Sequence, residues 1–563
     1  MSKKLLLLGV LLATLLPGAK ADVDPNFYIY ICFGQSNMEG NAQPESMDRN
    51  MTGIKERFQL LATCKFNDPS RVMGKWYNPV PPLVSPNGGL GPTDYFGRTM
   101  IAALPANVKI GVIPVAMGGS PIEMFDKDLY AQKMKDNPNE WWVTLAKNHY
   151  GSNPYGRIIE MAKKAQQVGV IKGILLHQGC SNNGNPSWPG MVKKIYNDML
   201  TDLNLGADSV PLFVGETEYQ DQGGSCYGHN AVVAKIPSTI PTGHVVSAKD
   251  VPGNKTDPWH FSALGYRILG KRYAMEALKV MKKEVKPDAA YTMPQALQKF
   301  YGAKSLAVTA SDVLVPGESI AVTATFGDNH KEDVSDYVTF RSNDILIQNG
   351  KIVGEGEGTL DVVYLDFCNQ ETTASKTIRV TFFPFTDDYL KTRQGTAAVD
   401  LGNRTITFSK ASASQVGWQY SNNVDWSAYR FLVIKLKEAQ TSDLQVRLYK
   451  KNGSSFTIGY MEAIGDRTVM AIDLQKMEYN KKTMDPSAIG KVVFHSTKVG
   501  TLVLDNVFLS NDASYGEYST GISDVSNASP FRAPLYSLDG RLAQPDMLKP
   551  GVYIQAGKKK VIR

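Results

Sequence analysis

The chain has 563 residues, more than a single hydrophobic core usually holds, so its length predicts two to four domains. Its composition, 43% hydrophobic and 20% charged, is that of an ordinary globular protein. The net charge of +7, from 61 basic and 54 acidic residues, is small for this length and gives no support to nucleic acid as a partner.

The first segment has the pattern of a secretory signal peptide over residues 1–21. Two lysines at positions 3 and 4 precede an apolar run at 5–16, and the tripeptide AKA at 19–21 has the spacing of a cleavage site. The run is too short to remain as a membrane span, and no later segment has 18 uninterrupted apolar residues. The sequence therefore predicts an exported protein, secreted or held at the cell surface, without a membrane span.

Residues 22–285 alternate between short apolar runs and amphipathic segments. Runs that are apolar on both faces are typical of parallel strands covered by helices, and they lie at 27–33, 108–116, 171–178, 210–216 and 244–249. Helical spacing of apolar residues recurs between them, at 158–165 and 192–203. The alternation predicts an α/β fold, a three-layer α/β/α sandwich with a parallel sheet. The long segment 41–107, rich in proline and glycine, is expected to build the rim of a site.

The rest of the chain reads as β-structure. A linker at 286–301 precedes period-two runs over 302–385, which predict a β-sandwich similar to bacterial immunoglobulin-like modules. Residues 386–512 resemble a jelly-roll sandwich of the carbohydrate-binding type. The fold class is therefore an α/β domain followed by two all-β sandwich domains.

The C-terminal region is expected to contain a flexible linker at 513–530, rich in Ser, Asn, Asp and Gly. Residues 531–563 resemble the C-terminal sorting domains of the type nine secretion system, because LKPGVYI is followed by a lysine run. That resemblance implies the type nine secretion machinery as a partner. A plain β-hairpin with a basic end is the alternative.

A serine lies just past the first predicted strand, in the stretch FGQSNMEG at 33–40. A serine hydroxyl is a weak nucleophile at neutral pH and needs an adjacent base, normally a histidine held by a third group. Among the seven histidines, His260 lies three residues after Asp257 in DPWHF, directly before an amphipathic segment. On one tight turn the Asp257 carboxylate can reach Nδ1, which leaves Nε2 free for Ser36, and Ser262 is placed to cap the following helix.

The α/β-hydrolase elbow G-x-S-x-G is the first alternative for this serine. Here the final glycine is missing, because the sequence runs Gly-Gln-Ser-Asn-Met at 34–38. The serine also follows the first strand, and the acid lies only three residues before the histidine. The α/β-hydrolase interpretation therefore fails on three counts.

Four blocks in chain order, FGQSNMEG, PVAMGGSPIEMF, LLHQGCSNN and DPWHF, resemble those of the SGNH (GDSL-type) hydrolase superfamily. The most similar branch is the carbohydrate acetylesterases, which include acetylxylan esterases and sialate O-acetylesterases. The resemblance covers about residues 25–283. It implies that Ser36 is the nucleophile, with Asp257 and His260 as acid and base, and that no metal or organic cofactor is required.

The same resemblance implies an oxyanion hole. Its donors would be the backbone N–H groups of Ser36 and Gly119 and the side chain of Gln178. This branch usually has Q-G-E-S where the present chain has Gln-Gly-Cys-Ser at 178–181, so Cys180 departs from the pattern. A Cys180–Cys226 bridge is one pairing left open among the five cysteines.

Trp188 and Trp259 neighbour the blocks, and we expect them to stack on a sugar ring. The leading hypothesis is a secreted serine esterase that removes O-acetyl groups from a plant polysaccharide, most readily acetylated xylan, so the partner is an acetylated polysaccharide or oligosaccharide. A sialate O-acetylesterase is the second hypothesis. A surface glycan-binding protein without catalysis is the alternative of another class.

Overall fold

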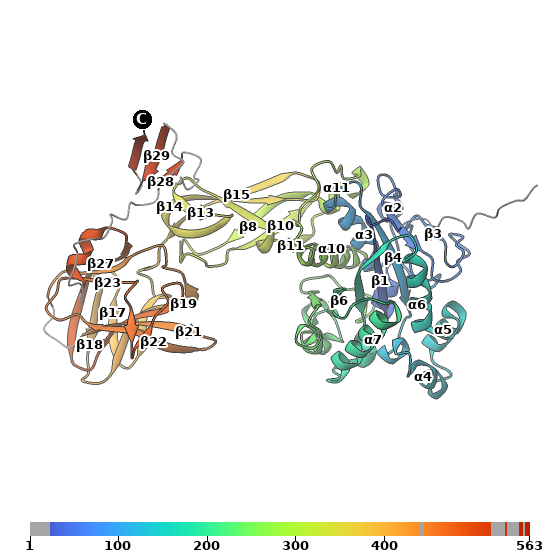
Figure 1. Ribbon diagram of the computed structural model, residues 1–563, viewed down its shortest axis with the longest axis horizontal. Helices are drawn as coiled ribbons and strands as arrows, with labels where there is room; N and C mark the ends of the chain where they lie inside the picture. Colours follow the sequence, from blue (N-terminus) through green and yellow to red (C-terminus); the bar gives the residue numbers. More distant parts are fainter. Residues whose placement is uncertain (1–22, 440–443, 520–534, 538–550, 556–557, 563) are drawn as a thin grey trace, which may run out of the picture. The chain divides into compact units, whose positions relative to one another are not determined.

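The computed structural model describes residues 23–439 and 444–519, together with the backbone of 535–537, 551–555 and 558–562 (Figure 1). The predicted signal peptide at 1–21 and most of the predicted linker at 513–530 lie outside these residues. The chain divides into two compact units, one of residues 1–307, 323–337 and 364–372 and the other of 308–322, 338–363 and 373–563. No helix in the described part of the chain has both the length and the apolar character that a membrane crossing requires.

A seven-stranded sheet in the order β3-β2-β4-β1-β5-β6-β7 forms the centre of the first unit. Every neighbouring pair is parallel except β2 and β3, which are antiparallel. The strands are β1 (Phe27–Gly34), β2 (Phe58–Leu61), β3 (Trp76–Tyr77), β4 (Lys109–Ala116), β5 (Val170–His177), β6 (Leu212–Gly215) and β7 (Gly243–Val246). The five predicted strands are thus present, and the two that the sequence did not predict lie in the 41–107 insertion.

Helices cover both faces of this sheet, and alternate side chains of β1 therefore enter two separate cores. Ile31 and Phe33 belong to one core, and Tyr30 and Cys32 belong to the other. The longer helices are α3 (Pro92–Ala103), α5 (Trp141–Tyr150), α6 (Pro154–Ala165), α7 (Trp188–Asp202) and α10 (Ala263–Val280). The predicted three-layer α/β/α sandwich is confirmed.

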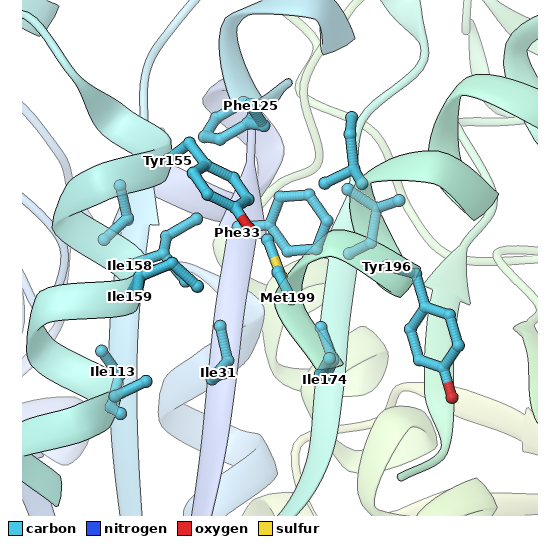
Figure 2. Packing of buried hydrophobic residues seen from close by; sticks show 14 of the residues in the cluster. Ile31, Phe33, Ile113, Phe125, Tyr155, Ile158, Ile159, Ile174, Tyr196 and Met199 are labelled. Atoms are coloured by element: carbon cyan, nitrogen blue, oxygen red, sulfur yellow. The ribbon is translucent and has the colours of Figure 1, made fainter. Parts of the chain in front are cut away.

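The first core shows how the helical spacing in the sequence is used. Ile158 and Ile159 of α6 and Met199 of α7 lie over Ile31 and Phe33 of β1 (Figure 2). These side chains are buried, and their apolar rows at three- and four-residue spacing are what hold the helices on the sheet. The carboxyl ends of the parallel strands are therefore fixed firmly, which matters because the site is built there.

The predicted linker at 286–301 differs in the structure. It contains α11 (Gln295–Tyr301), and Leu297, Phe300 and Tyr301 are fully buried in the second core. Their spacing of three and four residues places them on one helical face, and this apolar face makes the segment part of the packed domain.

The all-β part follows in two sets of sheets. The first set has the orders β11-β10-β8 and β12-β14-β15-β9, with β13 paired to β14. Its strands are β8 (Ala303–Thr309), β9 (Val313–Leu314), β10 (Ala321–Phe326), β11 (Lys331–Asp333), β12 (Val338–Arg341), β13 (Ile345–Gln348), β14 (Lys351–Leu365) and β15 (Glu371–Val380).

The second set is a sandwich of two five-stranded sheets, β16-β19-β26-β21-β22 and β17-β18-β27-β20-β23. Trp418 and Trp426 are fully buried in its core, so neither is available to a glycan at the surface. The strands are β16 (Leu390–Gln394), β17 (Ala397–Asp400), β18 (Thr405–Phe408), β19 (Ser414–Val424), β20 (Phe431–Leu436), β21 (Gln445–Asn452), β22 (Ser455–Ala463), β23 (Val469–Asp473), β26 (Ile489–Ser496) and β27 (Gly500–Ser510). The predicted class, an α/β domain followed by β-sandwich structure, is confirmed.

Within the predicted sorting segment at 531–563, three strands are described: β28 (Leu535–Ser537), β29 (Gly551–Gln555) and β30 (Lys558–Ile562). They form one antiparallel sheet in that order.

Candidate active site

The candidate site begins where β1 ends. Gly34 has a φ of +151°, and a Cβ at this position would overlap the carbonyl oxygen of His177 at the end of β5. Glycine is therefore required for the two strand ends to approach this closely. Immediately afterwards the chain turns into α1 (Ser36–Glu39), so Ser36 is the first residue of a short helix at the carboxyl edge of the sheet. Ligands of open α/β sheets bind at this edge.

Ser36 and the DPWHF loop meet although 224 residues separate Ser36 from His260. His260 Nε2 lies 2.9 Å from Ser36 Oγ, and His260 Nδ1 lies 2.9 Å from Asp257 Oδ1. An ionised carboxylate only accepts hydrogen bonds, so Nδ1 carries the proton and Nε2 is left to accept one from the serine hydroxyl. This arrangement has the geometry of a nucleophile, a general base and an orienting acid.

The Asp257 carboxylate is held in its ionised form. Burial pushes its pKa upward, but hydrogen bonds from the backbone N–H of Trp259 and from His260 outweigh burial, so the pKa lies below its ordinary value. The loop that carries both residues ends at Ser262, whose Oγ accepts a hydrogen bond from Gly265 N at 3.1 Å and caps α10 as predicted.

A second acid lies behind this pair. Glu218 is 2% exposed, and its carboxyl group occupies the space where Gly253 lacks a side chain. Burial, and then the negative charge of Asp257, raise the pKa of Glu218 to about 7. Its Oε2 has no hydrogen-bond partner among the described residues. Glu218 is therefore largely protonated below neutral pH, which limits the negative charge next to Asp257.

The residues beside Ser36 each hold a different loop, and Asn37 holds the loop of the histidine. Asn37 Nδ2 donates to the carbonyl oxygen of Trp259 at 2.9 Å, and Asn37 Oδ1 accepts from the hydroxyl of Tyr266 at 2.7 Å. Asn37 is 1% exposed, so these bonds replace water completely. The residue that follows the serine thus fixes the residue that precedes His260.

Gln35 holds the turn after β5 in the same manner. Its Oε1 accepts hydrogen bonds from the backbone N–H groups of Gly179 and Ser181, at 3.1 and 3.3 Å. Between these two residues, Cys180 forms a disulfide with Cys226. The position at which the resembling branch usually has glutamate therefore serves here as a covalent tie between two loops of the site.

Glu39 holds the glycine turn after β4. Its carboxylate accepts from Ser85 Oγ at 2.6 Å and from the backbone N–H of Gly118 at 2.7 Å. Gly119 has a φ of +74°, a left-handed conformation that suits glycine. Because the Gly118 N–H is already bonded, the next one along, that of Gly119, is the one available at the cavity. Sequence reasoning did not find the roles of Gln35, Asn37 and Glu39, although all three flank the serine in FGQSNMEG.

Two predicted site residues require correction. Trp188 is fully buried and its indole N–H donates to Gln178 Oε1 at 2.5 Å, so it has no face for a sugar. Gln178 is also fully buried, and its Nε2 donates to Asn182 Oδ1 at 2.7 Å. Both side chains satisfy their polar groups inside the domain, which removes Gln178 from the predicted donors of the oxyanion hole.

A cavity of about 410 Å³ opens over Ser36 and His260. Its wall includes Gly118 and Gly119, the Cys180–Cys226 bridge and two exposed tryptophans, Trp141 and Trp259, which are 56% and 51% exposed. No lysine or arginine lines it among the residues that the structure describes. Trp259 thus lines the cavity, and so does Trp141, which the sequence analysis did not single out.

One group of acids has the spacing of metal ligands: Asp126, Asp128 and Asp198. Lys194 Nζ lies among them, at 2.9, 2.7 and 2.9 Å from their oxygens, and neutralises part of their charge. These acids are not among the residues that line the cavity over Ser36.

Comparison with known proteins gives one family match. Residues 26–279 match the family described as carbohydrate esterase, sialic acid-specific acetylesterase. This segment contains all of the residues of the cavity described above, and the match assigns it to the carbohydrate esterases.

Three solved structures are similar to the chain. A protein from Arabidopsis thaliana is 20% identical, covers 46% of this chain and 99% of its own, and has a TM-score of 0.34. NanS is 15% identical with the same coverages and TM-score. A carbohydrate acetylesterase from Xanthomonas citri is 13% identical, covers 62% of this chain and 79% of its own, and has a TM-score of 0.32.

Proposed function

Residues 26–279 match the family of carbohydrate esterases described as sialic acid-specific acetylesterases, so the domain is a carbohydrate O-acetylesterase. We propose that its nucleophile is Ser36 and that its substrate is an acetylated plant polysaccharide, acetylated xylan in the first place. The observation that carries the proposed mechanism is the chain of two 2.9 Å contacts from Ser36 through His260 to Asp257.

In the proposed reaction His260 removes the proton from Ser36 as Oγ attacks the acetyl carbonyl carbon. The carbonyl oxygen becomes an anion, and the backbone N–H groups of Ser36 and Gly119 stabilise it. His260 then gives the proton to the departing sugar oxygen, which leaves an acetyl-serine. Water hydrolyses this ester by the same path, releasing acetate and restoring Ser36.

The charge of the cavity supports a neutral sugar over a sialic acid. A sialic acid carries a carboxylate, which is normally recognised by arginine or lysine. No such residue lines the cavity among the described residues, and the ionised carboxylate of Asp257, next to His260, disfavours an anion. The description of the matching family favours sialate O-acetylesterase activity as the second candidate. A glycan-binding protein without catalysis is disfavoured by the intact Ser36–His260–Asp257 arrangement.

We also propose the setting in which the enzyme acts. The signal-peptide pattern at 1–21 supports export, and the resemblance of 531–563 to sorting domains supports passage through the type nine secretion system to the cell surface or the medium. The β-sandwich structure that follows the esterase domain in the chain would bind the polymer and so keep the enzyme on its substrate.

The proposed function is tested by acetate release from acetylated xylan and from O-acetylated sialoglycan, each with the wild-type protein and with Ser36→Ala. We expect release from xylan that is lost in Ser36→Ala, with a clearly lower rate on the sialoglycan. A higher rate on the sialoglycan would overturn the choice of substrate, and equal rates of the two proteins would overturn the role of Ser36.

A further inference from the structure

A second cavity, of about 420 Å³, lies in the loop region after β6. It is lined by Tyr219, Gln220, Asp221, Tyr227 and Asn230, none of which belongs to the cavity over Ser36. Its wall combines two phenol rings with polar side chains, and no lysine or arginine is among the described residues that line it. Such a surface suits a sugar, whose ring has an apolar face and a hydroxyl edge.

The two cavities share one stretch of chain. Cys226 lines the cavity over Ser36, and the next residue, Tyr227, lines the second one. The disulfide from Cys226 to Cys180 joins this stretch to the turn beside the serine. Ser225 N also donates to the carbonyl oxygen of Pro258 at 2.8 Å, which joins it to the loop of the histidine.

One residue in the wall of the second cavity, Asn230, is held in place by hydrogen bonds to Thr217. Asn230 Oδ1 accepts from the N–H and the hydroxyl of Thr217, at 2.8 and 2.9 Å, and Asn230 Nδ2 donates to the carbonyl oxygen of Thr217 at 2.9 Å. The Thr217 hydroxyl also lies 2.9 Å from the carbonyl oxygen of Cys226, so its single proton is shared between that oxygen and Asn230 Oδ1. Asn230 therefore needs little ordering when a ligand binds, which favours affinity.

Exposed aromatic side chains concentrate at these two cavities. Among the described residues, the large exposed aromatic side chains are Trp141, Tyr227, Trp259 and Tyr518, between 44% and 56% exposed. Three of the four line one or the other cavity. Aromatic rings left in water at cavity walls are typical of binding surfaces, because their burial is deferred until a ligand arrives.

We propose that the second cavity is a subsite for a further sugar of the same neutral polysaccharide chain, with Tyr227 as its stacking platform, while the acetylated sugar lies against Trp141 and Trp259. This inference rests on the proposed function and deepens it: the enzyme recognises a segment of at least two sugars. Asp221 contributes a hydrogen-bond acceptor for sugar hydroxyls, and its charge disfavours acidic sugars.

The test compares acetylated xylo-oligosaccharides of one to six sugars with 4-nitrophenyl acetate, which is too small to reach the second cavity. We expect kcat/KM of the wild-type protein to rise about tenfold from the single sugar to the longer chains, a gain typical of one aromatic contact. In Tyr227→Ala the ratio of oligosaccharide to 4-nitrophenyl acetate activity is expected to fall about tenfold. Tyr227→Phe, which retains the ring, is expected to keep most of the ratio.

Tyr518→Ala is the matched control, because Tyr518 is equally exposed and lines neither cavity. The proposal is overturned if the wild-type protein shows no dependence on chain length, if Tyr227→Ala keeps the ratio, or if Tyr518→Ala loses it equally. A measurement without substitutions is the inhibition of 4-nitrophenyl acetate hydrolysis by unacetylated xylose and xylohexaose. We expect the hexamer to inhibit about tenfold better, and equal inhibition would contradict the subsite.

Failure of the proposed function gives a different result. If Ser36→Ala releases acetate as fast as the wild-type protein, the mechanism itself is wrong. If release depends on Ser36 but not on chain length, only the second subsite is wrong.

Discussion

The side-chain amide of Asn37 donates to the main-chain carbonyl of Trp259 at 2.9 Å, across 222 residues of sequence. Through this bond the residue next to the candidate nucleophile fixes the loop that delivers the candidate base. The Asn37 side chain is buried, and the second end of its amide is bonded to Tyr266 in the first turn of α10. The spacing of Ser36 and His260 is therefore set by a side chain that takes no part in the proposed reaction.

Replacing Asn37 by alanine is expected to lower kcat by about 10- to 100-fold with little change in KM, because the His260 loop loses its attachment while the cavity wall stays in place. The free energy of unfolding should fall by about 1–3 kcal/mol, since the buried hydroxyl of Tyr266 and the partly buried carbonyl of Trp259 each lose a hydrogen bond. Steady-state kinetics and urea unfolding measure both effects. Tyr266→Phe, which removes only one of the bonds, should have a smaller effect on kcat, and a wild-type kcat in Asn37→Ala would contradict the positioning role.

The raised pKa of Glu218 predicts that the free energy of unfolding depends on pH. Burial and the charge of Asp257 raise its pKa from 4.5 to about 7, so the folded state holds this proton more tightly than the unfolded state. Its contribution to stability is therefore complete below about pH 4.5 and is lost as the pH rises through about 7. Glu218→Gln cannot ionise, so its free energy of unfolding relative to the wild-type protein should be higher at pH 8 than at pH 5. Urea unfolding at the two pH values measures this difference, and an equal difference at both would show that Glu218 has an ordinary pKa.

Trp188 and Trp259 are expected to have different roles, the first in stability and the second in substrate binding. Trp188→Ala should lower the free energy of unfolding by about 3–5 kcal/mol, because the indole is fully buried. Trp259→Ala should change the free energy of unfolding by no more than about 0.5 kcal/mol, because the side chain is 51% exposed, and should instead raise KM for an acetylated sugar. Urea unfolding together with kinetics on acetylated xylan distinguishes the two. If Trp188→Ala raised KM and left the free energy of unfolding unchanged, Trp188 would be a substrate-binding residue after all.

Much of the fold could be predicted because the local pattern is strong. The strand that leads to Ser36 is apolar on both faces, and the helices over Ile158 and Val192 have regular apolar spacing. The short strands β2 and β3 escaped prediction because four and two residues carry too little periodicity, and their existence depends on pairing with distant strands. Helix α11 escaped for a similar reason, since its seven residues follow a turn-rich stretch.

At the site, the distant pair Ser36 and His260 was predicted from the resemblance, and the pair Asp257 and His260 from local spacing. The orientation of Gln178 and Trp188, in contrast, depends on tertiary burial and was not predicted. Asp257 and His260 are three residues apart, so a single turn brings their side chains together. Whether Gln178 faces the cavity or the interior depends on its neighbour Trp188, which lies ten residues later and needs a partner for its buried indole N–H. No local sequence pattern predicts which way the Gln178 side chain points.

The central claim is that Ser36 is the nucleophile and that His260 activates it, and covalent labelling tests this claim most directly. A 4-nitrophenyl phosphonate ester would be added to the wild-type protein and to His260→Ala, and the modified residue located by mass spectrometry of peptides. We expect one phosphonyl group on Ser36 of the wild-type protein, in step with loss of acetate release, and labelling slowed by at least about 10³-fold in His260→Ala. Labelling of another residue, or full acetate release from a protein modified at Ser36, would contradict the account.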